Sequence, residues 1–123
     1  MKKLLLGLLL FCSTSFADIK VVTDANFKNE VLDASNCGTV VVVDVYANWC
    51  GACQNLSPML EAAANDPKNA KIKFVRIDSD NNNMPPNIQF LPTVIIYKPS
   101  KAIRHVGTFG SVKEFQKWLD ANK

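Results

Sequence analysis

Two cysteines, Cys50 and Cys53, lie between a predicted strand and a predicted helix, and this junction limits what the chain can fold into. The strand is the nearly continuous apolar run at residues 40–46, which is typical of a strand covered on both faces. The helix-forming stretch follows at residues 54–65. The first cysteine therefore stands at a helix start, where free N–H groups and the helix dipole favour a thiolate. Because the thiolate is the nucleophile of thiol–disulfide exchange, the pattern indicates an oxidoreductase.

The beginning of the chain has the pattern of a secretory signal peptide. Residues 1–17 combine a basic start, an apolar run and small residues before a cleavage site. The apolar run is too short to span a membrane, which needs roughly 20 residues. An uncleaved anchor and a lipid on Cys12 are the alternatives, although the residue before Cys12 is bulky for a lipoprotein signal. We expect cleavage after Ala17, an exported and periplasmic protein, and one domain at residues 18–123.

The composition of the remaining chain excludes several classes of protein. Removing 17 of the 123 residues leaves 106, enough for one domain with its own core. The whole chain has 14 Lys and Arg against 11 Asp and Glu, and loss of the two lysines at its start leaves 12 against 11. No basic cluster indicates a nucleic-acid partner. Three cysteines remain, too few for a disulfide-linked scaffold, and their odd number leaves one thiol unpaired.

The pattern along the chain predicts an α/β fold. The expected elements are a strand at 19–22, a helix at 25–34, a strand at 40–46, a helix at 54–65, a strand at 71–77, a hairpin of strands at 93–98 and 102–106, and a helix at 112–121. We expect Pro58 to kink the second helix and residues 78–90 to form a loop or a short helix. Alternating strands and helices favour a central mixed sheet with helices on both faces. The first three strands are expected to be parallel and the hairpin antiparallel.

Several landmarks occur in an order that resembles the thioredoxin family, and secreted thioredoxin-like proteins in particular. They are Val43-Asp44, the run from Ala47 to Cys53, Pro58, Leu91-Pro92-Thr93 and Val106-Gly107. The resemblance runs from about residue 19 to residue 122. It implies a thioredoxin fold and a thiol–disulfide oxidoreductase that acts on protein disulfides. No cofactor is expected, because the dithiol itself is the redox group.

The resemblance implies three catalytic residues. Cys50, at the helix start, would attack the substrate disulfide, and Cys53 would resolve the mixed disulfide by attacking Cys50. Asp44 lies inside a valine run, where burial raises the pKa of a carboxyl, and it would accept the proton of Cys53. The alternative is an aspartate at a strand edge that faces water. Arg76 falls where thioredoxins often place a charged residue near that aspartate, and an exposed strand arginine is the alternative.

The resemblance also implies a groove that binds the substrate peptide. Trp49 would shield the thiolate and contact substrate, although it also suits an ordinary core. The peptide bond before Pro92 would be cis, which leaves the backbone of Leu91 free to pair with an extended peptide, although any edge strand tolerates a proline there. The residues expected to bind substrate are Trp49, Gly51, Ala52, Leu91, Pro92, Val106 and Gly107.

The chain departs from the family pattern at four places. Ala52 stands where thioredoxins have proline, which bears on the redox potential. Gln54 stands where many have a basic residue. The segment at residues 80–92 is shorter than the family helix that it replaces and rich in Asn and Pro, which bears on partner choice. Cys37 is additional, and it bears on side reactions.

Metal binding is the alternative use of a cysteine pair. A zinc site would need Cys37 and His105 beside Cys50 and Cys53. Seven strand residues, however, span roughly 23 Å at about 3.3 Å each, so Cys37 and Cys50 are expected at opposite ends of the strand. A copper carrier is disfavoured because no methionine flanks the motif.

These observations favour a monomeric reductase of exported protein disulfides that is supplied by a membrane electron donor. A disulfide-forming oxidase is the second choice, because such bacterial oxidases usually carry a large helical insertion and no segment here is long enough. A peptide-binding or chaperone-like module that uses the groove without turnover is the alternative from another class. Asp44, Cys50 and Cys53 count against that alternative, since a pure binding domain needs none of them.

Overall fold

The structure is a computed structural model that describes residues 19–123. The expected signal peptide, its cleavage after Ala17 and the alternative lipid on Cys12 lie outside the described residues. Within residues 19–123, no helix is both long enough and apolar enough to cross a membrane.

Five strands form one mixed sheet in the order β1-β3-β2-β4-β5. Their bounds are β1 Lys20–Val22, β2 Val41–Tyr46, β3 Lys73–Asp78, β4 Thr93–Lys98 and β5 Lys101–Val106. The first three strands pair in parallel, and β4 and β5 add antiparallel pairs. The predicted strand directions are therefore confirmed, with each strand boundary within two residues of its prediction.

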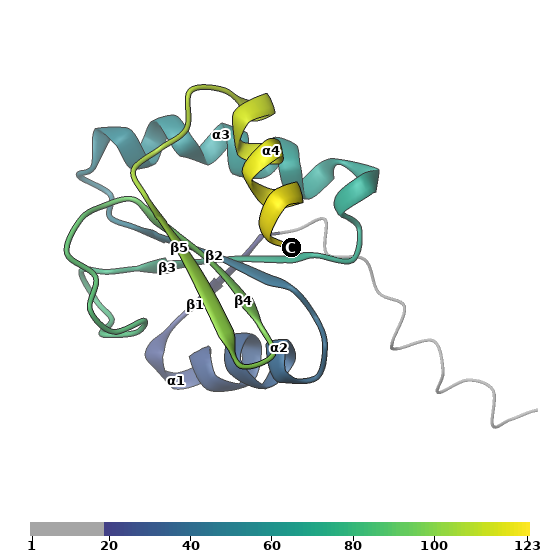
Figure 1. Ribbon diagram of the computed structural model, residues 1–123. Helices are drawn as coiled ribbons and strands as arrows, with labels where there is room; N and C mark the ends of the chain where they lie inside the picture. The colour runs from purple at the N-terminus through teal and green to yellow at the C-terminus, as the bar shows by residue number, and fades with distance from the viewer. Residues whose placement is uncertain (1–18) are drawn as a thin grey trace, which may run out of the picture.

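The helical segments cover both faces of this sheet (Figure 1). Their bounds are α1 Asp24–Phe27, η2 Lys28–Asp33, α2 Ala34–Asn36, α3 Gly51–Asn65, η3 Pro67–Asn69 and α4 Val112–Asn122. In Figure 1, α3 and α4 lie above the sheet, and α1 and α2 lie below it. The predicted α/β fold with a central mixed sheet is confirmed.

The central strand β2 is buried on both faces, and each face packs into a different hydrophobic cluster. Successive side chains of a strand point to opposite faces. Val41, Val43 and Val45 accordingly pack with α1 and its neighbours, whereas Val42 packs with residues of α3 and α4. Asp44 follows Val42 in this alternation and therefore faces the layer that contains α3. The near-continuous valine run is needed because both faces are covered.

The first helix differs from its prediction. Helical structure runs from Asp24 to Asn36, but its middle, η2, is a π-helix. Thr23 is the N-cap residue of this helix, and its N–H donates to Asn26 Oδ1 at 2.8 Å. The π segment was not predicted because one residue more per turn does not change the apolar pattern of so short a stretch.

The connection between β3 and β4 and the last helix can also be compared with their predictions. Residues 79–92 form turns and bends without a helix, so the loop alternative is confirmed over the short helix. The last helix forms where it was predicted, and its Val112 is 44% exposed, whereas Phe115 and Leu119 are buried. Val112 is the first residue of α4, and it extends beyond the edge of the core.

Candidate active site

Cys50 and Cys53 form a disulfide at the start of α3, with their Cα atoms 5.2 Å apart. Cys50 is the N-cap residue of this helix, and the N–H of Cys53 donates to Cys50 Sγ at 3.1 Å. The Cys50 side chain is 7% exposed and that of Cys53 is 1% exposed. The first sulfur therefore receives one of the free N–H groups of a helix N-terminus, an arrangement that stabilises a thiolate in the reduced state.

The loop before β4 packs against the disulfide. Leu91 contacts the cluster formed by the two cysteines and Ala47. The peptide bond between Leu91 and Pro92 is cis, as the resemblance implies. The N–H of Gly107 donates to the carbonyl oxygen of Pro92 at 2.8 Å. Gly107 has a φ of +96°, a conformation that glycine adopts without the strain of a side chain.

The other residues expected to bind substrate surround the disulfide and are open to solvent. Gly51 and Ala52 are exposed in the first turn of α3, and Val106 is 58% exposed at the end of β5. Trp49 is 71% exposed, so the ordinary-core alternative for Trp49 is wrong. The roles assigned to these residues stay predictions, but the fold brings all of them to one end of the sheet.

Trp49 is held by a residue that the sequence analysis missed. Its ring N–H donates to the carboxylate of Asp80, at 2.9 Å to Oδ2 and 3.2 Å to Oδ1. The two residues are 31 positions apart, and Asp80 lies in an irregular loop. No periodic pattern or short motif connects such a pair, so no signal in the sequence would have found it.

Asp44 is fully buried, and its main partner is Arg76 of β3. Arg76 Nε donates to Asp44 Oδ2 at 3.0 Å, whereas Asp44 Oδ1 has no hydrogen-bond partner. Burial raises the pKa of Asp44 to about 6, and the charge of Arg76 opposes part of this effect. The alternative of an aspartate that faces water is therefore wrong.

Arg76 is also placed by an aromatic ring. Its guanidinium carbon lies 4.1 Å from the centroid of Tyr46, a cation–π contact, and its side chain is only 23% exposed. The alternative of an exposed strand arginine is therefore wrong. Tyr46 is a second residue that the sequence analysis did not assign to the site.

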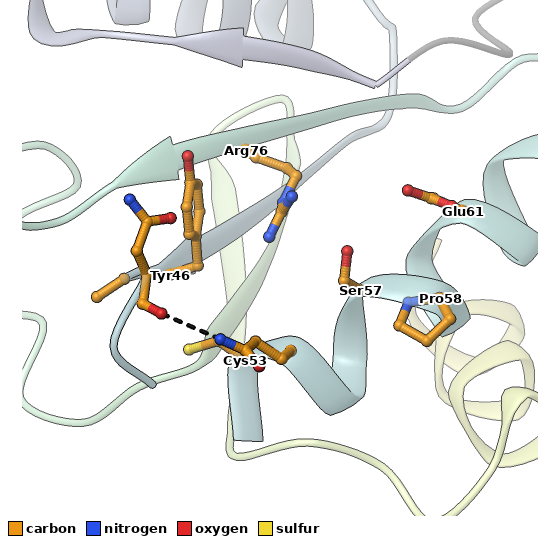
Figure 2. Close-up of a pocket in the computed structure, with 9 residues that line it drawn as sticks. Tyr46, Cys53, Ser57, Pro58, Glu61 and Arg76 are labelled. Atoms are coloured by element: carbon orange, nitrogen blue, oxygen red, sulfur yellow. Dashed lines mark hydrogen bonds between the residues drawn. The ribbon is translucent and has the colours of Figure 1, made fainter. Parts of the chain in front are cut away.

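A cavity of about 510 Å³ connects Cys53 with Arg76. Figure 2 shows Tyr46 and Arg76 on one side of this cavity and Ser57, Pro58 and Glu61 of α3 on the other. The cavity thus brings solvent-accessible space to the second cysteine and to the arginine that binds Asp44. A carboxyl with a pKa near neutrality in this position suits proton transfer in thiol chemistry.

The residues considered for zinc are not assembled. Among residues 19–123, no three side chains of His, Cys, Asp or Glu are grouped as metal ligands would be. Cys37 is an exposed free thiol before β2, and Cys50 follows that strand. The ring of His105 stacks on Phe109 with centroids 3.9 Å apart.

Comparisons with known proteins agree with this geometry. A family model described as Thioredoxin matches residues 18–121. A thioredoxin of Pseudomonas aeruginosa is 34% identical over 82% of this chain and 93% of its own. A thioredoxin of Porphyra purpurea is 36% identical over 69% of this chain and 78% of its own.

Solved structures show the same similarity in three dimensions. The crystal structure of a chloroplastic thioredoxin z has a TM-score of 0.71 and 25% identity, over 85% of this chain and 93% of its own. A thioredoxin of Malassezia sympodialis has a TM-score of 0.71 at 24% identity, over 88% of this chain and 93% of its own, and this match shows the fold alone.

Proposed function

This chain belongs to the thioredoxin family of thiol–disulfide oxidoreductases, and from that premise we propose that it reduces disulfides of exported proteins with electrons from a membrane donor. Its substrates are disulfide-containing proteins. The proposal adds the direction of transfer, the compartment and the electron donor. The signal-peptide pattern of residues 1–17 supports export.

The reaction uses the three catalytic residues in sequence. The Cys50 thiolate attacks one sulfur of the substrate disulfide, which forms a mixed disulfide and releases a substrate thiolate. Cys53 then gives its proton to Asp44 and attacks Cys50 Sγ, which forms the Cys50–Cys53 disulfide and releases the second substrate thiolate. Two electrons pass to the substrate in total, its two thiolates take up protons from solvent, and Asp44 releases the proton of Cys53 to solvent. A dithiol of the membrane donor returns the enzyme to its reduced state by the reverse exchange.

The buried Asp44 carboxyl is the observation that favours an enzyme with catalytic turnover over a module that only binds peptides. Burial of an ionisable group with one oxygen unpaired costs free energy. A module that only binds peptides through the groove gains nothing from this cost. An enzyme does benefit if Asp44 accepts the proton of Cys53, because a carboxyl with a pKa of about 6 exchanges protons near neutral pH.

The reductase direction is supported by the short connection between β3 and β4. Within the described residues, β3 and β4 are joined by a loop without a helix, so this connection carries none of the large helical insertion that bacterial oxidases usually have. We further propose that the enzyme acts as a monomer, since its disulfide and the predicted substrate-binding residues come from one chain.

Reduction of insulin with dithiothreitol as donor tests the activity, and equilibration with glutathione tests the direction. We expect turnover by the wild type, none by the Cys50→Ser/Cys53→Ser double variant, and a potential close to that of thioredoxin, about −270 mV. A potential near that of a strongly oxidising relative of thioredoxin, about −120 mV, would show that the enzyme is an oxidase and not a reductase. Suppression of aggregation by the double variant, without turnover by the wild type, would favour the chaperone-like module.

A further inference from the structure

Resting on the proposed function, we propose that a second groove beside the disulfide selects the substrate by binding an extended, uncharged and apolar stretch of its chain. We call it the side groove: it lies between Trp49 and the loop at residues 79–91, with a volume of about 590 Å³. This loop stands where the family helix noted in the sequence would be, and it supplies most of the residues that line the groove.

The side groove is continuous with the active site. Trp49 and Leu91 line it, and Leu91 also packs against the cluster that contains Cys50 and Cys53. A peptide whose cysteine reaches Cys50 therefore places its neighbouring residues at the entrance of the groove. Extended peptides bind by backbone pairing with the protein and by side chains that enter such pockets.

The apolar side chains of the side groove include two that are open to solvent. Phe90 is 64% exposed and Trp49 is 71% exposed, and they are the two large aromatic side chains exposed to this degree in the described part of the chain. Met84 and Ile88 are partly buried and line the same groove. Exposed apolar side chains that gather around a cavity mark a binding surface, and aromatic residues contribute most to such contacts.

The charge of the side groove sets the chemistry of its occupant. None of the side chains that line it is ionisable, and the polar ones are amides and one hydroxyl, among them Asn83, Asn87 and Gln89. Amides both donate to and accept from a peptide backbone. A charged substrate residue would lose hydration here without gaining an opposite charge. The cavity next to Cys53, by contrast, is lined by Arg76 and Glu61.

The loop that forms the groove is held in place before substrate arrives. Near its start, the Asp24 carboxylate accepts the N–H groups of Asn83 and Met84, each at 2.8 Å. Further on, Arg104 donates to the carbonyl oxygens of Pro86 at 2.7 Å and Asn87 at 2.9 Å. A site that is already ordered loses less conformational entropy on binding, so it can discriminate between substrates.

Two peptides with the same internal disulfide test the proposal. One carries Phe and Leu beside its cysteine and the other carries Lys and Glu, and kcat/KM is measured for each with dithiothreitol as donor. We expect the wild type to prefer the uncharged peptide about tenfold. Phe90→Lys should abolish this preference, and Phe90→Ala should weaken it. Reduction of hydroxyethyl disulfide, which is too small to reach the groove, should not change.

Val21→Lys is the matched control, because it adds the same charge at a valine that is 57% exposed on β1, outside the groove. Equal rates on both peptides, or equal behaviour of Phe90→Lys and Val21→Lys, would overturn the side groove while the reductase stands. A wild type that reduces neither peptide nor hydroxyethyl disulfide would remove the proposed function, and the side groove with it.

Discussion

At the scale of single residues, the two cysteines of the disulfide have different surroundings. Cys50 is at the helix start, accepts the N–H of Cys53 and retains 7% exposure, whereas Cys53 is buried to 1%. An incoming disulfide therefore reaches Cys50 more readily, and the same residue has the better stabilised thiolate. Cys37 is fully separate, as an exposed free thiol.

We expect Cys53→Ser to accumulate mixed disulfides with substrate, because Cys50 still attacks and nothing resolves the product. Cys50→Ser should form none and should lose turnover. Non-reducing electrophoresis after reaction with a disulfide-containing protein measures both results. Cys37→Ser is the control and should keep wild-type turnover. Mixed disulfides in Cys50→Ser but not in Cys53→Ser would reverse the two assignments.

At the scale of elements, the loop at residues 79–91 depends on two side chains from outside it. Asp24 belongs to α1 and Arg104 to β5, and each binds backbone groups of the loop. The loop lacks the internal hydrogen bonds of a helix, and these contacts from other elements satisfy four of its backbone groups. Its order is therefore a tertiary property.

We expect Arg104→Gln to loosen the second half of the loop, because the carbonyls of Pro86 and Asn87 lose their charged donor. Amide hydrogen exchange at residues 87–91 should become several-fold faster. The free energy of unfolding should fall by about 1 kcal/mol or less, since the arginine is exposed. Lys101→Gln, on the same strand, is the control. Unchanged exchange in Arg104→Gln would show that the loop is ordered without this contact.

The sequence predicted the elements that local patterns define and missed the contacts between distant ones. The valine run of β2 and the cysteines at the start of α3 marked the strand, the helix start and the buried Asp44, because burial and capping leave signals in neighbouring residues. The contacts of Asp24 and Arg104 with the loop join segments up to 60 positions apart. Such pairs have no fixed spacing, so neither was predictable from one sequence.

At the scale of the whole molecule, one end of the sheet collects the site from segments far apart in the chain. The cysteine pair follows β2, the loop with Pro92 precedes β4, and Gly107 follows β5. Because β2 and β4 form an antiparallel pair, the end of β2 lies beside the start of β4. The same central position of β2 buries Asp44 beneath the layer that contains α3, so the ionisation of the carboxyl that we propose as the proton acceptor is coupled to the stability of the fold.

We expect this coupling to make the stability of the oxidised protein fall as pH rises. The pKa of Asp44 is about 6 in the folded state, above the value of 3.8 that it has when exposed. The folded protein therefore binds the proton more tightly, and stability is lost between about pH 4 and pH 6 as the buried carboxyl ionises. The difference between 3.8 and about 6 corresponds to at most about 3 kcal/mol.

Asp44→Asn should remove this loss, because an amide does not ionise. At pH 8 the free energy of unfolding of the variant should exceed that of the wild type by about 1–3 kcal/mol. The gain should stay below the upper limit of about 3 kcal/mol, because Arg76 loses its anionic partner in the variant. Near pH 4 the advantage should shrink or disappear. Urea unfolding from pH 4 to pH 8, with the disulfide intact, measures the difference. Asp120→Asn, at a carboxylate that is 49% exposed, is the matched control and should follow the wild type. Parallel curves for Asp44→Asn and the wild type would mean that Arg76 holds the pKa of Asp44 below the tested pH range, and the carboxylate would then be too weak a base to take the proton of Cys53 as proposed.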